Sequence, residues 1–139
     1  MRQVHDDGGR EAAGYRGLTG DCVTRAIAIA TETPYVVIYG LINDIGREYG
    51  RNSAARLGPP IKAVHKAMAE LGWQWQPTMF IGSGTRVHLR EDELPAGHLV
   101  CRLSGHTCAV IDGVIHDLSN PSRGGTRAVY GYWFNPDER

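Results

Sequence analysis

The chain has 139 residues, which suffices for one domain with a buried core and is too short for two of ordinary size. Its 15 basic and 15 acidic side chains give a formal net charge of zero, which argues against nucleic-acid binding through bulk charge. No apolar run approaches the roughly 18 residues of a membrane span, and the polar N-terminus does not resemble a signal peptide. We therefore expect a single cytoplasmic domain over residues 1–139, with no membrane partner.

The first predicted elements are an irregular segment and a helix. Residues 1–20 are rich in glycine and predict a lead-in segment with a short strand around Gln3–His5. An apolar helical stripe follows it, formed by Val23, Ala26, Ile27 and Ala30. Thr19 or Asp21 is expected to cap this helix with its side-chain oxygen. Cys22 would then lie in the first turn.

Two more helices are predicted in the first half of the chain. Thr33-Pro34 is typical of a helix start, with a capping hydroxyl followed by proline, and residues 46–58 predict a loop. A third helix is expected from about Pro60 to Leu71, because Gly72 can end it. The buried stripes of the second and third helices are expected to be Ile38, Leu41, Ile42 and Ile45, and Ile61, Val64, Met68 and Leu71.

After Gly72 the pattern favours strands. Tryptophans alternate with glutamines over residues 73–77, and residues 81–84 predict a turn. Four short β-prone runs follow, at His98–Leu103, His106–Ile111, Val114–Leu118 and Arg127–Phe134. Helices followed by mostly antiparallel strands predict an α+β fold.

Cys22 is the first candidate for chemistry. A thiol in the first turn of a helix faces unpaired backbone N–H groups and the positive end of the helix dipole, and both favour the thiolate. The same N–H groups can hold an oxyanion. The alternative is an ordinary buried helix cysteine. Cys101 and Cys108 complete an odd number of cysteines, so we expect free thiols and no disulfide.

The second candidate is a hairpin that contains a histidine and an aspartate. Asp112-Gly113 between two β-prone runs predicts a two-residue type I′ turn, which would place Ile111 opposite Val114. In this register His106 and Asp117 are diagonal neighbours on one face, with backbones roughly 7–8 Å apart. We therefore expect them to share a hydrogen bond.

These residue types match the three parts of a catalytic triad: Cys22 as nucleophile, His106 as base and Asp117 as the group that orients the base. Taken alone, His106 could also be an ordinary strand histidine that hydrogen-bonds the backbone. Asp117 alone could be a residue that caps the end of a strand. His116 would lie on the opposite face, and Asn120 is an alternative third member. Thr19, Asp21 and Asn120 are weaker candidates for oxyanion or supporting roles.

Other side chains carry weaker signals. His106 and Cys108 share a strand face and could bind zinc, but no spacing typical of a metal site appears, so we expect no metal and no cofactor. Arg25, Arg123 and Arg127 are expected to be solvated or ion-paired, with one of them available to a substrate carboxylate.

Several segments resemble a family of small uncharacterised bacterial and phage proteins. They are residues 20–31, 72–75, 82–89, 93–95 and 109–117. The helix start at Asp21-Cys22 and the later Gly105-His106 strand also resemble, remotely, papain-like peptidases and amidases of the peptidoglycan-hydrolase and leader-peptidase kinds. This resemblance implies a papain-like fold with N-terminal helices packed on the sheet. Arg16–Thr19 occupy the stretch where such enzymes often carry a glutamine for the oxyanion hole.

The hypothesis is therefore a papain-like cysteine hydrolase or acyltransferase that acts on an amide, isopeptide or thioester bond of a peptide, protein or small acyl substrate. Cys22 would attack, His106 would move the proton and Asp117 would orient His106. Two alternatives stay open. One is a non-catalytic bacterial or phage binding protein, directed for example at a host factor or defence system. The other is transglutaminase-like acyl transfer by the same residues.

Overall fold

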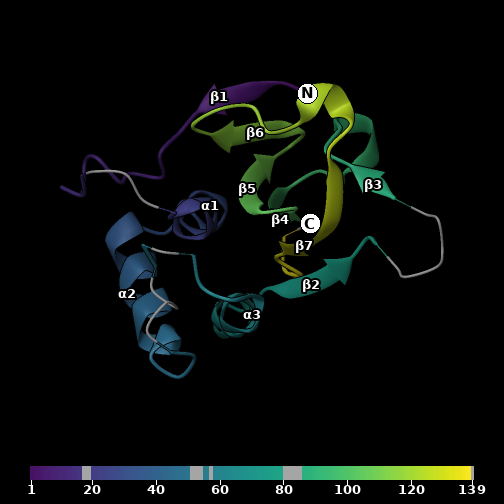
Figure 1. Ribbon diagram of the computed structural model, residues 1–139. Helices are drawn as coiled ribbons and strands as arrows, with labels where there is room; N and C mark the ends of the chain where they lie inside the picture. The colour runs from purple at the N-terminus through teal and green to yellow at the C-terminus, as the bar shows by residue number, and fades with distance from the viewer. Residues whose placement is uncertain (17–19, 51–54, 57, 80–85, 139) are drawn as a thin grey trace.

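The computed structural model describes residues 1–16, 20–50, 55–56, 58–79 and 86–138, and its architecture is α+β. Within these residues three α-helices lie to one side of a curved sheet (Figure 1). The helices are α1 (Cys22–Thr31), α2 (Tyr35–Gly46) and α3 (Ile61–Glu70), with two 3₁₀ turns, η1 (Glu91–Glu93) and η2 (Arg123–Gly125). The strands are β1 (Gln3–His5), β2 (Gln74–Pro77), β3 (Val87–His88), β4 (His98–Leu103), β5 (His106–Ile111), β6 (Val114–Asp117) and β7 (Ala128–Phe134).

The sheet is mostly antiparallel. Its order over the described strands is β1-β6-β5-β4-β7-β2, and β3 pairs with β7 outside this path. The exception in direction is β1, which runs parallel to β6 with Val4 opposite His116. The α+β class expected from the sequence is confirmed, while β3 was not predicted and the expected turn at residues 81–84 lies outside the described residues.

The β5–β6 hairpin has the predicted register. Ile111 pairs with Val114 and Val110 pairs with Ile115. Asp112 and Gly113 both have positive φ, 47° and 80°, as a type I′ turn requires. Because the turn is two residues long, it determines which side chains of the two strands share a face.

The helix α1 is the centre of the molecule. All eight residues from Val23 to Ala30 are buried, including Thr24 and Arg25. One side of α1 contacts α2, and the other contacts β5 and β4. The predicted apolar stripe is therefore buried, but a single stripe was an incomplete description, because a helix covered on all sides buries its polar residues as well.

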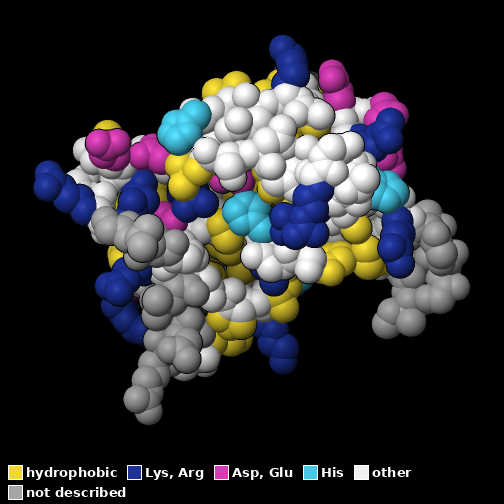
Figure 2. Space-filling view, turned by 45° about the horizontal axis from the view of Figure 1, so that its top comes forward, with side chains coloured by type: hydrophobic (Ala, Val, Ile, Leu, Met, Phe, Trp, Pro, Cys, Tyr) yellow, Lys and Arg dark blue, Asp and Glu magenta, His cyan; other side chains and the backbone are white. Residues whose placement is uncertain are grey.

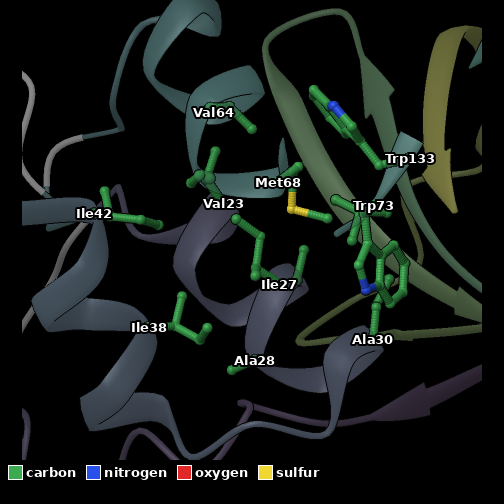
Figure 3. Close-up of a cluster of buried hydrophobic side chains, with 14 of the residues drawn as sticks. Val23, Ile27, Ala28, Ala30, Ile38, Ile42, Val64, Met68, Trp73 and Trp133 are labelled. Atoms are coloured by element: carbon green, nitrogen blue, oxygen red, sulfur yellow. The ribbon is translucent and has the colours of Figure 1, made fainter. Parts of the chain in front are cut away.

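The main core fills the space between the helices and the sheet. Ile27 of α1, Ile38 of α2 and Met68 of α3 are all fully buried, and Figure 3 shows them directed toward one another. Trp73 and Trp133 close this core on the side of the sheet (Figure 3). The predicted stripes of α2 and α3 thus line this core, although three of their residues are only partly buried: Leu41, Ile61 and Leu71.

The start of α2 differs in detail from the prediction. Pro34 is the N-cap residue and does not occupy the first helical position, and no side chain caps this helix. The predicted cap by Thr33 is therefore wrong, and its hydroxyl instead contacts the carbonyl of Thr31 at 3.4 Å. Ile38, Ile42 and Ile45 are nevertheless buried as expected, because tertiary packing rather than capping determines their burial.

A second core covers the other face of the sheet. It contains Cys101 and Cys108, which are direct cross-strand partners of β4 and β5 and are both buried free thiols. Burial raises the pKa of both thiols, that of Cys101 to about 12. These two cysteines are therefore poor nucleophiles, in contrast to a thiol at a helix start.

The close contact between β7 and β2 yields a stability prediction. A Cβ at Gly131 would lie 2.3 Å from Cζ2 of Trp75, so Gly131→Ala should destabilise the fold by about 1–3 kcal/mol. Gly40 of α2 is a matched control, since no described residue beyond its own stretch of helix places an atom within 4 Å of a Cβ there. Gly40→Ala should stabilise by about 0.5–1 kcal/mol. Urea unfolding of both variants checks this, and equal stabilities would contradict the packing.

Candidate active site

Cys22 is the first residue of α1 and is partly exposed. Its thiol is influenced by two residues at the start of β5, because hydrogen-bonding interactions with His106 and with the backbone of Thr107 both lower its pKa. The start of the helix therefore lies against the start of the strand. The thiol has the position in the first helical turn that the sequence predicted.

The ring of His106 connects the thiol to a carboxylate. Its Nε2 lies 2.6 Å from Oδ2 of Asp117, so the hydrogen bond predicted from the hairpin register is present. Because Asp117 takes Nε2, Nδ1 is the ring nitrogen left for the Cys22 sulfur. The His106 side chain is 23% exposed, so the ring remains reachable from solvent.

The pKa values of the three groups are shifted together. The hydrogen bond to Asp117, followed by that to Cys22, raises the pKa of His106 to about 9. Burial alone would raise the pKa of Cys22, but the hydrogen bond and charge of His106, with Thr107 and Arg25, bring it below its ordinary value. Both shifts therefore favour the pair in which Cys22 is a thiolate and His106 an imidazolium.

Asp117 is held by several groups at once. Its carboxylate accepts hydrogen bonds from His106 and, at 2.7 Å, from the backbone N–H of Leu118. Its backbone carbonyl accepts from the Asp6 N–H at 3.0 Å and from Gln3 Nε2 at 2.8 Å. Although Asp117 is buried, with 4% exposed, the donors to its carboxylate keep its pKa below the ordinary value. The carboxylate therefore stays ionised beside His106.

The N-terminal segment lies against this site. The strand β1 pairs with β6 up to Asp117, and Gly8 lies directly on the backbone of α1. A Cβ at Gly8 would be 3.1 Å from the carbonyl oxygen of Arg25, and the φ of Gly8 is +71°. Only a residue without a side chain fits there comfortably.

A buried arginine links the two ends of the site. Arg25 is 9% exposed and forms ion pairs with Asp21 and, at 3.6 Å, with Oδ1 of Asp117. Asp21 is 1% exposed and is also bound by Tyr35 at 2.6 Å and by Arg10 at 3.4 Å. The start of α1 is thus fixed by ion pairs that reach Asp117.

This arrangement corrects the expected role of Asp21. The Asp21 side chain makes no capping hydrogen bond to α1, because it is directed to Arg25 and Tyr35 instead. The predicted cap by Asp21 is therefore wrong, and the contacts of Asp21 are structural ones. Arg25 was expected to be solvated or paired, and its pairing with Asp21 has the i, i+4 spacing that a sequence can reveal.

The remaining candidates lie apart from the thiol or outside the described residues. Asn120 donates to the carbonyl of Met1 and accepts from the N–H of Ser122, so its amide orders a turn and does not contact His106. His116 lies 3.3 Å from a carboxylate oxygen of Asp6, away from His106 as the register predicted. Thr19 is outside the described residues.

Two further findings concern the described residues as a whole. No cluster of three or more His, Cys, Asp or Glu side chains among them could hold a metal ion. None of their helices combines the length and apolar character needed to cross a membrane. Cys108, the second member of the zinc alternative, is buried in the second core.

Comparisons of the chain with protein-family models, with curated proteins and with solved structures gave no match.

The site yields a prediction for His106. In solution the pKa of His106 should be about 9. Asp117→Asn should lower this pKa toward the ordinary value near 6.5, because a neutral asparagine amide cannot stabilise the imidazolium as the Asp117 carboxylate does. NMR titration of the imidazole carbons measures this. Asn120→Ala is the control and should leave the pKa unchanged. If the pKa of His106 fell in Asn120→Ala and did not change in Asp117→Asn, the group that orients His106 would be the Asn120 amide.

Proposed function

We propose that this chain is a papain-like cysteine enzyme, a hydrolase or acyltransferase that acts on an amide, isopeptide or thioester bond. The observation that carries the proposal is the position of His106, which hydrogen-bonds Asp117 at 2.6 Å and interacts with Cys22 so that the pKa of the thiol falls and that of the imidazole rises. Three groups so linked match the chemistry of a nucleophile, its proton carrier and the group that orients the carrier. The partners implied are peptide, protein or small acyl substrates.

The first step is acylation of the thiol. The Cys22 thiolate attacks the substrate carbonyl carbon, a C–S bond forms and the carbonyl electron pair moves to oxygen. As this intermediate collapses, the bond to the leaving group breaks and the imidazolium of His106 gives its proton to the departing atom. The products are an acyl-thioester on Cys22, a neutral His106 and a free leaving group.

The second step restores the enzyme. Neutral His106 takes a proton from the incoming water or amine, which attacks the thioester carbonyl. The C–S bond then breaks, the thiolate returns and the imidazolium is present again. Asp117 keeps its charge throughout, holds Nε2 and stabilises the imidazolium whenever it forms.

The start of α1 supplies the electrostatic support. Asp21 does not cap this helix, so its side chain does not occupy the first-turn N–H groups near Cys22. Such N–H groups can accept the negative charge that develops on the carbonyl oxygen. The helix dipole acts in the same direction, because its positive end lies at Cys22.

Acylation of Cys22 tests the proposal. The protein is incubated with a panel of peptide amides, isopeptides and thioesters, and intact-mass spectrometry follows acyl-Cys22 and released product. We expect at least one donor to acylate the wild type and none to acylate Cys22→Ala. Asp117→Asn should slow acylation by up to about 10⁴-fold, and Asn120→Ala should do much less.

The outcomes separate the alternatives. Release of free acid indicates a hydrolase, whereas an added primary amine that appears in the product indicates acyl transfer. A folded wild-type protein that no donor acylates would contradict the enzyme proposal and favour a binding protein.

A further inference from the structure

Arg102 contacts Thr107, the residue whose backbone interacts with Cys22, and it has no carboxylate partner among the described residues. It is half-buried on β4, and its Nη1 donates to the Thr107 hydroxyl at 3.4 Å. No ion pair joins Arg102 to a carboxylate among the described residues. In contrast, Arg25 is neutralised by Asp21 and Asp117.

The sheet register places Arg102 on the same side as the nucleophile. Arg102 and Thr107 are direct cross-strand partners, and the backbone of Thr107 interacts with the Cys22 thiol and lowers its pKa. Two residues further into the sheet, Val100 and Ala109 pack into the core under the helices. Since side chains alternate along a strand, Arg102 and Thr107 continue this helix-facing side to the ends of their strands.

An aromatic wall lies beyond Arg102. Its partner on β7 is Gly131, and the Trp75 ring occupies the space above that glycine. The row that leads away from Cys22 therefore consists of Thr107, Arg102 and then Trp75. Figure 2 shows Lys and Arg side chains beside a histidine near the middle of one face of the molecule.

We propose that Arg102 binds an anionic group of the substrate, a carboxylate close to the scissile bond. This inference rests on the proposed function, because it assigns a substrate class to that same site. Neighbouring strands are about 4.8 Å apart and an extended peptide advances about 3.4 Å per residue, so Arg102 reaches a group one or two residues from the scissile carbonyl. A planar guanidinium suits a carboxylate, which it can bind through two parallel hydrogen bonds.

A matched pair of thiol reagents tests this. Iodoacetate and iodoacetamide both form an S–C bond with the thiolate and release iodide, but only iodoacetate carries a carboxylate. Intact-mass spectrometry with peptide mapping gives the rate of Cys22 alkylation by each. Measurements use wild type, Arg102→Gln and Lys62→Gln. Lys62 is exposed on α3, so its substitution is a control for the change in net charge.

We expect Arg102→Gln to lower the iodoacetate-to-iodoacetamide rate ratio by about tenfold, a size typical of a lost charge-assisted hydrogen bond. Lys62→Gln should leave the ratio unchanged, and Arg102→Lys should retain part of it. An unchanged ratio in Arg102→Gln would overturn the inference. The inference would also be overturned if Arg102→Gln slowed Cys22 alkylation equally with both reagents, because Arg102 would then act on the thiolate and not on the carboxylate of the reagent.

The result also separates this inference from the proposed function. If neither reagent alkylates Cys22 of the wild type faster than a free cysteine in solution, the reactive thiol itself is absent and both proposals fail. If Cys22 reacts rapidly with both reagents but Arg102→Gln leaves the iodoacetate-to-iodoacetamide rate ratio unchanged, the anionic substrate class is wrong and the cysteine enzyme proposal stands.

Discussion

The 2.6 Å hydrogen bond between His106 and Asp117 is the contact on which the candidate site depends. It exists because the two-residue turn at Asp112-Gly113 sets the register of β5 and β6. A turn longer by one residue would move one of the two side chains to the opposite face. The hairpin therefore does more than join two strands, since it selects Asp117 and excludes His116 as the partner of His106.

The rest of the fold brings the thiol to this hairpin. The helix α1 is buried on all sides, so its position is determined by α2 and by the sheet together. Its first residue, Cys22, then meets the first residues of β5. The N-terminal segment adds two hydrogen bonds to the carbonyl of Asp117, which hold the end of β6 in place.

Buried charge is the second constraint. Burial of an unpaired ion is costly, and removal of one partner of a buried pair leaves the other uncompensated. Here the charges balance in a chain of contacts, in which Arg25 lies between Asp21 and Asp117, and His106 lies between Asp117 and Cys22. Such a chain keeps Asp117 ionised, and the charge of Asp117 in turn sustains the imidazolium.

Much of this could be predicted from the sequence, for identifiable reasons. The strands β4 and β5 were predicted with their bounds from β-prone runs, and the register of the β5–β6 hairpin was predicted because the Asp112-Gly113 turn has strict backbone requirements. The three helices were predicted from apolar spacing. These signals are local, and each depends on residues close together in the chain.

The features that were missed depend on distant parts of the chain. The parallel pairing of β1 with β6 joins residues more than 110 positions apart, and no local pattern indicates it. The burial of Arg25 and Asp21 depends on α1 being covered on every side, whereas the sequence shows only one apolar stripe. The link from Arg102 through Thr107 to Cys22 depends on the pairing of β4 with β5 and on the packing of α1 against β5.

Reaction of the intact protein with a neutral electrophilic thiol probe, followed by peptide mapping, tests the central claim most directly. If His106 and Asp117 sustain a Cys22 thiolate, the probe should label Cys22 selectively at neutral pH and leave the buried Cys101 and Cys108 unmodified. His106→Ala should abolish this selectivity. Equal labelling of Cys22 in wild type and in folded His106→Ala would contradict the claim that His106 activates the thiol.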